Sequence, residues 1–299
     1  MYHNPVLLKE SIDALNITPD GIYVDATFGG GGHSRAILKK LKNGRLFAFD
    51  QDEDAMSNRI DDPRITMINS NFRYIKNFLR FYKSVPVDGI IADLGISSHQ
   101  IDVDERGFST RSDGTLDMRM DRRQELTAGD IINTYPQDQI QRVIKEFGEV
   151  RNALQVSRII VSARKEKLFR TTADLKETLE SVAEKGKENK YFAQVFQALR
   201  IEVNRELESL TELLINGTSI LRQGGRFVIL SYHSLEDRII KDFFRSGNAA
   251  GIINKDFYGK PLLPLKVITR KPIMPSDDEI MKNKRARSAR MRIAEKIQS

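Results

Sequence analysis

The sequence predicts an α/β domain built on a parallel sheet and interrupted by a helical insertion. Short apolar segments separated by stretches long enough for a helix are found at 21–27, 44–50, 64–70 and 87–95. Strands that alternate with helices are typical of a parallel sheet covered on both faces. From about residue 105 the chain becomes charged, amphipathic and helical, and a strand pattern returns only at 224–234. We therefore expect both ends of the chain to belong to the α/β part.

The first predicted strand and the first predicted helix differ in their pattern of apolar residues. GIYVDAT at 21–27 is short, β-branched and bounded by glycine, which is typical of a buried strand. The stretch SRAILKKLK that follows it places Ile37, Leu38 and Leu41 on one helical face. The switch from one pattern to the other puts a strand-to-helix turn at the intervening glycines.

The predicted insertion contains helical patterns and no convincing strand. Segments such as QDQIQRVIKEFG and TTADLKETLESVAEK are amphipathic with helical spacing, and a long helical stretch runs from about 191 to 221. KVITR and SARMRIA are the last strand candidates. The predicted organisation has a first α/β part at 1–105, a helical insertion at 106–199, and a second α/β part at 200–299.

Composition favours a folded protein outside the membrane. The chain has 299 residues, of which 40% are hydrophobic and 30% charged, enough for a sizeable core. No apolar run approaches the roughly 18 residues of a membrane span, and the start MYHNPVLLKES lacks the apolar region of a signal peptide. We expect a cytoplasmic protein.

Cysteine and histidine usage excludes several chemistries. There is no cysteine, so disulfides, thiolate metal sites, iron–sulfur clusters and a cysteine nucleophile are excluded. The four histidines include no pair at the i, i+4 spacing of a helical metal site. We expect no metal.

The net charge of +7 is concentrated near the end of the chain. Residues 258–299 hold eleven Lys or Arg and four Asp or Glu, so the remaining residues sum to zero. The stretch KRARSARMR at 284–292 carries five of these cations. Such a cluster is either a solvated surface or a set of phosphate contacts. A polyanionic partner is the working hypothesis.

A glycine-rich loop and two acids predict a nucleoside pocket. DATFGGGGHS at 25–34 follows the first strand, where doubly wound sheets bind ligands. Asp50 and Asp93 end the second and fourth strands, and a carboxylate at the end of the second strand can accept the two hydrogen bonds of a ribose diol. The dinucleotide fingerprint would need a further glycine where Ser34 or Arg35 stands. S-adenosylmethionine is therefore favoured over NAD.

Several blocks of the sequence resemble one family closely. They are HNPVLLKESID, GIYVDATFGGGGHS, IADLGISSHQIDVDERGFSTRSDGTLDMRMD, FQALRIEVNRELE, GGRFVILSYHSLEDRIIKDFF and RARSARMRIAE, and they span the chain from end to end. They resemble the bacterial small-subunit ribosomal RNA cytosine-N4 methyltransferase family. The resemblance implies a class I S-adenosylmethionine-dependent methyltransferase fold, with a mostly parallel seven-stranded sheet. It implies that the helical insertion at 106–199 is a substrate-recognition domain between the two parts of the methyltransferase domain. It also implies action on a decoding-centre cytosine of 16S ribosomal RNA.

The same resemblance implies a set of cofactor contacts. These are carried over to Gly31, Gly32, His33, Asp50, Phe72, Asp93 and Gln100.

The predicted chemistry is methylation of an exocyclic amine. The lone pair of that amine is delocalised into the ring, so an enzyme must accept hydrogen bonds from its N–H groups and align it with the methyl group. Methylation at C5 of cytosine generally uses a cysteine, which this chain lacks. The candidate catalytic residues are Asp93, Ser97 and His233.

Each of these candidates has a structural alternative. Asp93 can cap a strand end, Ser97 can cap a helix, and His233 can be structural. Phe72 is either an adenine wall or part of the core. Arg106, Arg111 and Arg119 are candidates for RNA phosphates or for salt bridges with Asp104, Asp113 and Asp117.

Two other functions share parts of this pattern. A nicotinamide-dependent oxidoreductase would use the same sheet and Asp50. A non-catalytic RNA-binding or ribosome-assembly factor would keep the basic C-terminal stretch but leave DLGISS and SYHSLEDR without a role. The oligomeric state stays open, a homodimer included.

Overall fold

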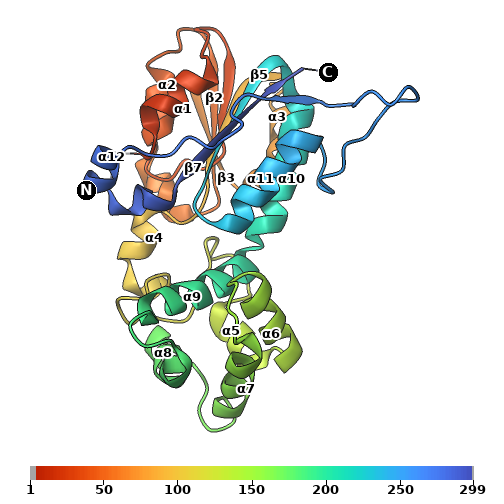
Figure 1. The fold of residues 1–299 in the computed structure, drawn as a ribbon. Helices are drawn as coiled ribbons and strands as arrows, with labels where there is room; N and C mark the ends of the chain where they lie inside the picture. The colour runs from red at the N-terminus through yellow and green to blue at the C-terminus, as the bar shows by residue number, and fades with distance from the viewer. Residues whose placement is uncertain (1–4, 298–299) are drawn as a thin grey trace. The chain divides into compact units, whose positions relative to one another are not determined.

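The structure is a computed structural model that describes residues 5–297. The chain divides into two compact units (Figure 1). The first comprises Met1–Gly95 and Leu207–Ser299, and the second comprises Ile96–Glu206.

The predicted domain boundaries, after 105 and after 199, both lie inside the second unit. Packing explains the difference. Phe108, Leu116 and Met118, in an irregular polar stretch, are buried in the core of the second unit, and one unbroken helix crosses residues 199 and 200. Burial of these few apolar side chains is not visible as a sequence period.

The first unit is built on a seven-stranded sheet with the order β3-β2-β1-β4-β5-β7-β6. β1 to β5 pair in parallel, and β7 is antiparallel to both β5 and β6. The mostly parallel sheet that the sequence predicts is thus confirmed. The strands are β1 (Ile22–Asp25), β2 (Arg45–Asp50), β3 (Ile65–Asn69), β4 (Val87–Asp93), β5 (Leu221–Ser231), β6 (Leu265–Val267) and β7 (Arg290–Lys296).

Alternate residues of each strand point to opposite faces of the sheet, so each face has its own core. Tyr23 and Ile91 pack with α1 and α2, whereas Val24 and Ile90 pack with α3, α10 and α11 (Figure 1). The helices of this unit are α1 (Leu8–Leu15), α2 (Gly32–Leu38), α3 (Ile75–Phe81), α10 (Glu206–Ile220), α11 (Ser234–Ser246) and α12 (Asp277–Lys282). Short 3₁₀ helices are η1 (Glu53–Asn58), η2 (Phe72–Tyr74) and η5 (Lys284–Ser288).

The second unit is helical, as predicted, and within residues 96–206 the structure has no strand beyond an isolated bridge between Thr115 and Thr171. Its helices share a core of their own, in which Ile131, Val143 and Leu199 are fully buried. The elements are α4 (Ser98–Asp102), η3 (Asp104–Arg106), α5 (Ala128–Thr134), α6 (Gln137–Glu146), α7 (Ala153–Ala163), α8 (Thr172–Leu179), η4 (Glu180–Val182) and α9 (Glu188–Asn204).

The single helical stretch expected at about 191 to 221 is two helices. α9 ends at Asn204, and Arg205 adopts a left-handed conformation with φ 47°. A left-handed residue ends the run of helical hydrogen bonds. Among the described residues, no helix combines the length and the apolar character that crossing a bilayer requires.

Candidate active site

Three carboxylates end three neighbouring strands of the first unit. Asp25 ends β1, Asp50 ends β2 and Asp93 ends β4. Because β1 lies between β2 and β4 in a parallel sheet, their carboxyl ends meet at the same edge. The strand order reverses there, which is where sheets of this type bind ligands.

The glycine run forms the turn between β1 and α2. Gly29 and Gly31 have φ values of 51° and 73°, a region that side chains rarely adopt. A Cβ at Gly31 would lie 2.8 Å from the Phe28 ring, and one at Gly32 would lie 2.0 Å from Cγ of Pro5. Bare backbone is therefore required at both positions. The glycines allow the turn after β1 to pack closely against Phe28 and Pro5.

Asp50 holds the glycine loop against the second strand. Its two carboxylate oxygens accept hydrogen bonds from the backbone N–H of Gly29, at 2.7 Å, and of Asp52, at 2.9 Å. Burial raises the pKa of Asp50 to about 7, and the neighbouring Asp52 and Asp25 carboxylates add to that rise. Each oxygen still has a lone pair for a hydroxyl donor. Hydrogen bonds from a ribose diol would favour the ionised form.

Asp25 is buried beneath the same loop. The Ser34 hydroxyl donates to its carboxylate at 2.7 Å, and the N–H of Thr27 donates at 3.2 Å. Burial raises the pKa of Asp25 to about 6, although these hydrogen bonds favour the charged form. Asp25 therefore ties the start of α2 to the end of β1.

Asp93 has one oxygen engaged and one that faces a histidine. The Tyr232 hydroxyl donates to Oδ1 at 2.7 Å, and His33 Nδ1 lies 4.0 Å from Oδ2. The N–H of Asp93 donates to the Thr27 hydroxyl at 2.6 Å, which ties β4 to the glycine loop. Burial raises the pKa of Asp93, whereas His33 and the Tyr232 hydrogen bond lower it.

His33 stands in the first turn of α2 and is buried. Burial lowers its pKa, while Asp93 and the backbone of Val6 act in the opposite direction. A neutral imidazole beside the Asp93 carboxylate is the favoured form. His33 and Asp93, each predicted as a cofactor contact, thus lie close together.

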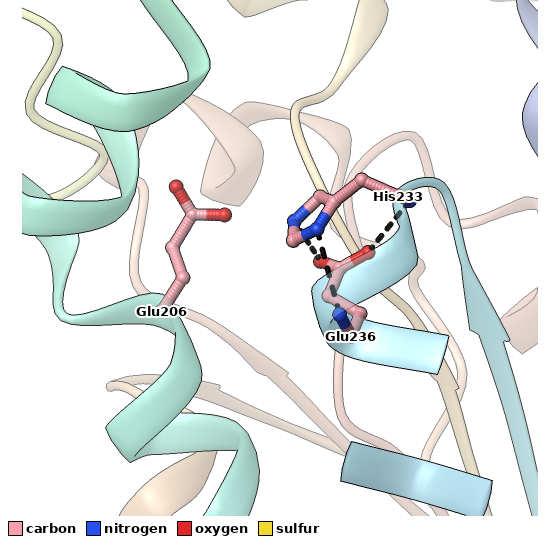
Figure 2. Close-up of side chains that lie close together, drawn as sticks. All are labelled: Glu206, His233 and Glu236. Atoms are coloured by element: carbon pink, nitrogen blue, oxygen red, sulfur yellow. Dashed lines mark hydrogen bonds and ion pairs between the residues drawn. The ribbon is translucent and has the colours of Figure 1, made fainter. Parts of the chain in front are cut away.

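His233 begins α11 and forms a capping box with Glu236 (Figure 2). Its Nδ1 accepts a hydrogen bond from the N–H of Glu236 at 3.4 Å, and Glu236 in turn accepts from the N–H of Tyr232 at 2.9 Å. His233 therefore caps the helix, which is the structural role that the sequence left open. The same box fixes the backbone of Tyr232, whose hydroxyl reaches Asp93.

Phe72 follows β3 and begins η2. Its side chain is partly buried and packs against the core on the side of α3 and α10. Asn71, just before it, donates to the Gln51 side chain at 2.7 Å, which ties the segment after β3 to the segment after β2. Phe72 therefore contributes to the core and still has an exposed part.

Ser97 and Gln100 belong to the second unit and form a capping box at the start of α4. The Ser97 hydroxyl accepts from the N–H of Gln100 at 3.2 Å, and the Gln100 carbonyl oxygen accepts from the N–H of Ser97 at 3.0 Å. The helix-cap alternative describes what Ser97 does here.

The arginines after α4 have structural roles. Arg119 forms a bidentate salt bridge with Asp117, with distances of 2.8 Å. Arg106 is buried and donates to the carbonyl oxygens of Arg119 and Met120. For these two residues the structure favours internal contacts over RNA phosphates.

Sequence reasoning did not single out Asp25, Thr27, Tyr232 or Glu236. Asp25 carries the same signal as Asp50 and Asp93, an acid at a strand end, and could have been found. Tyr232 gives no comparable signal, because its partner Asp93 lies 139 residues away in the sequence.

The strand order, the glycine turn and the carboxylates at the strand ends agree with the class I S-adenosylmethionine-dependent methyltransferase fold. The chain belongs to the MraW methylase family, whose profile matches residues 1–297. The family resemblance seen in the sequence is thereby confirmed. Membership favours a methyltransferase over both the nicotinamide-dependent oxidoreductase and the non-catalytic RNA-binding factor.

Two similar proteins carry the same descriptive name. The chain is 54% identical over 297 residues to a protein of Flavobacterium johnsoniae named ribosomal RNA small subunit methyltransferase H, covering 99% of this chain and 98% of that protein. It is 55% identical over 298 residues to the protein of the same name from Cytophaga hutchinsonii, covering 99% and 100%. Among solved structures, a putative rRNA methylase from Clostridium thermocellum covers 99% of this chain and 100% of its own, with 12% identity and a TM-score of 0.46.

Proposed function

We propose that this protein transfers the methyl group of S-adenosylmethionine to the N4 amine of a cytosine in the decoding centre of 16S ribosomal RNA. The names of its relatives support ribosomal RNA of the small subunit as the substrate. The absence of cysteine from the chain supports an amine nitrogen over the C5 position of the base.

The residues of the first unit fit the cofactor. The turn that contains Gly31 and Gly32 follows β1 at the ligand edge of the sheet, where the methionine part would lie against the backbone. Asp50 accepts the ribose hydroxyls, and the exposed part of Phe72 offers a face to the adenine. S-adenosylmethionine supplies an electrophilic methyl group. Gln100 remains a proposed contact to this cofactor.

The observation that carries the proposal is how the two oxygens of the Asp93 carboxylate are hydrogen-bonded. Tyr232 fixes Oδ1, and within residues 5–297 no hydrogen bond reaches Oδ2. An acceptor held in this way can take a hydrogen bond from the N4 amine and orient its lone pair. With S-adenosylmethionine bound, the nitrogen would attack the methyl carbon with that lone pair as the methyl–sulfur bond breaks, which leaves S-adenosylhomocysteine. The nitrogen would then lose one proton, to Asp93 or to water. Ser97 and His233 remain proposed contacts to the base.

The RNA base must leave its stack to reach a methyl donor at the strand ends. We propose that the helical second unit and the basic C-terminal stretch contact RNA. Single-stranded RNA is the expected form of the substrate, because its bases cost less free energy to unstack. Phosphate contacts make affinity fall steeply with salt. We propose that this activity takes place in the cytoplasm. We also propose a homodimer, which light scattering would test.

The test uses 16S ribosomal RNA from a strain that lacks this activity. The purified protein is incubated with S-adenosylmethionine and that RNA, and the digested nucleosides are identified by mass spectrometry. We expect one N4-methylated cytosine per RNA, and its loss with Asp93→Ala. A product methylated at C5, or full methylation by Asp93→Ala, would rule out the proposed chemistry.

A further inference from the structure

A hairpin between α11 and β6 projects from the first unit, and the proposed cofactor site does not use it (Figure 1). It spans residues 247–264, drawn in blue, and we call it the arm. Its two sides are joined by hydrogen bonds from the N–H of Asp256 to the Lys260 carbonyl at 2.9 Å and from the N–H of Leu262 to the Asn254 carbonyl at 2.8 Å. The arm is therefore an ordered hairpin.

The tip of the arm presents two aromatic side chains to solvent. Phe257 is 97% exposed and Tyr258 is 90% exposed, with ring centroids 5.6 Å apart. The Asp256 carboxylate accepts the N–H groups of Tyr258 and Lys260, each at 2.9 Å, and Gly259 takes a φ of 79°. Local hydrogen bonds thus fix a turn that holds both rings away from the protein, where they contribute nothing to the core.

The arm and the strand after it are basic. Residues 247–271 contain Lys255, Lys260, Lys266, Arg270 and Lys271 and a single acid, Asp256. That acid is used in the turn. Exposed aromatic rings beside cations are the combination that binds single-stranded nucleic acid, since bases stack on the rings and phosphates meet the cations.

The arm begins at the edge of the sheet opposite the cofactor site. α11 starts beside the carboxyl end of β5 and runs back over 13 residues, which is about 20 Å of helix. β6 then starts at Leu265, which pairs with Lys296. The adjacent Glu295 pairs with Arg226, and Arg226 pairs with Gly89 near the amino end of β4. A contact made by the arm is therefore separate from the contact with the target base.

We propose that the arm anchors an unpaired segment of the RNA substrate, with bases stacked on Phe257 and Tyr258 and phosphates near Lys255 and Lys260. This proposal rests on the proposed function, because it assumes an RNA substrate. A second copy of the chain fits less well. Two aromatic side chains offer at most about 500 Å², below the roughly 800 Å² per partner of a stable interface.

A fluorescent variant tests contact directly. The chain has no tryptophan, so Phe257→Trp places a single indole at the tip of the arm. We expect an unpaired fragment of the ribosomal RNA substrate to quench its emission, and a fully paired RNA of equal length to quench it much less. Unchanged emission with RNA, or a shift only with anionic phospholipid vesicles, would overturn the proposal.

Kinetics of the double variant Phe257→Ser/Tyr258→Ser provide the second test. Losing stacking for even one base should raise KM for RNA at least about 5-fold, with kcat and S-adenosylmethionine affinity unchanged. Phe81→Ser removes another highly exposed ring, 79% exposed on α3, and should leave KM unchanged. Equal KM values for the double variant and the wild type would overturn the proposal for the arm, whereas no methylation by the wild type would overturn the proposed function.

Salt dependence tests the lysines. Two phosphate contacts to single-stranded RNA contribute about 1.4 to the slope of log affinity against log salt. Lys255→Ala/Lys260→Ala should reduce the slope by about that amount, with unchanged methylation at saturating RNA. An unchanged slope would remove the two lysines from the contact.

Discussion

The Tyr232 hydroxyl donates a hydrogen bond of 2.7 Å to Asp93 Oδ1 and so joins the segment after β5 to the end of β4. Glu236 accepts the N–H of Tyr232, so the start of α11 fixes the position of the phenol. One carboxylate oxygen is thereby held in place while the other faces the region where we place the amine. Tyr232 is a positioning residue in the proposed mechanism.

Tyr232→Phe should lower the methylation rate about 10-fold, since a hydrogen bond to a charged group is worth roughly 1.5–3 kcal/mol. The loss should grow as the pH falls. Tyr232 lowers the pKa of Asp93, so without it the carboxyl group becomes protonated at a higher pH. Rates measured over a series of pH values check the prediction, and Tyr82→Phe is the control. A loss that does not vary with pH would argue against the positioning role.

Affinity for S-adenosylmethionine should rise as the pH rises through about 7. Burial raises the pKa of Asp50 to about 7, and the ribose hydroxyls bind the ionised carboxylate. Asp50→Asn should bind more weakly and lose this pH dependence. Calorimetry from about pH 6 to about pH 8 measures both effects, with Asp13→Asn, an exposed acid of α1, as the control. Dependence on pH that survives Asp50→Asn would point to another group.

Gly31→Ala and Gly224→Ala separate backbone strain from crowding. Both glycines have positive φ values, 73° and 81°, but a Cβ at Gly31 meets Phe28 and Arg35 while one at Gly224 meets nothing within 4 Å. Each variant should lose about 1 kcal/mol of stability from strain. Only Gly31→Ala should also lose cofactor affinity. Denaturant unfolding measures stability and calorimetry measures cofactor affinity. Equal cofactor affinities of the two variants would show that the glycine loop does not contact the cofactor.

The stability of the protein should depend on pH through Asp25. Burial raises its pKa from 3.8 to about 6, so its contribution is fully present below about pH 4 and is lost as the pH rises through about 6. The difference corresponds to about 3 kcal/mol. The stability of Asp25→Asn relative to that of the wild type should therefore be higher at about pH 8 than at about pH 5. Urea unfolding at the two pH values tests this expectation, and a constant difference between variant and wild type would contradict it.

The sequence by itself determined the strands of the sheet and the location of the ligand edge. Short apolar, β-branched runs, glycines after β1, and acids at the ends of β2 and β4 are local signals that can be read from the sequence. The helical character of 96–206 follows in the same way. The boundaries of the second unit do not, because they depend on which apolar residues of an irregular stretch, such as Phe108 and Met118, become buried.

Only the tertiary structure decided which side chains meet. The contact between Tyr232 and Asp93, the proximity of His33 to that acid, and the exposure of Phe257 and Tyr258 join or separate residues in ways that no sequence spacing encodes. The capping roles of Ser97 and His233 were open alternatives until their hydrogen-bond partners were placed. The physical reason is that strand pairing and helix packing bring together segments whose separation along the chain carries no period.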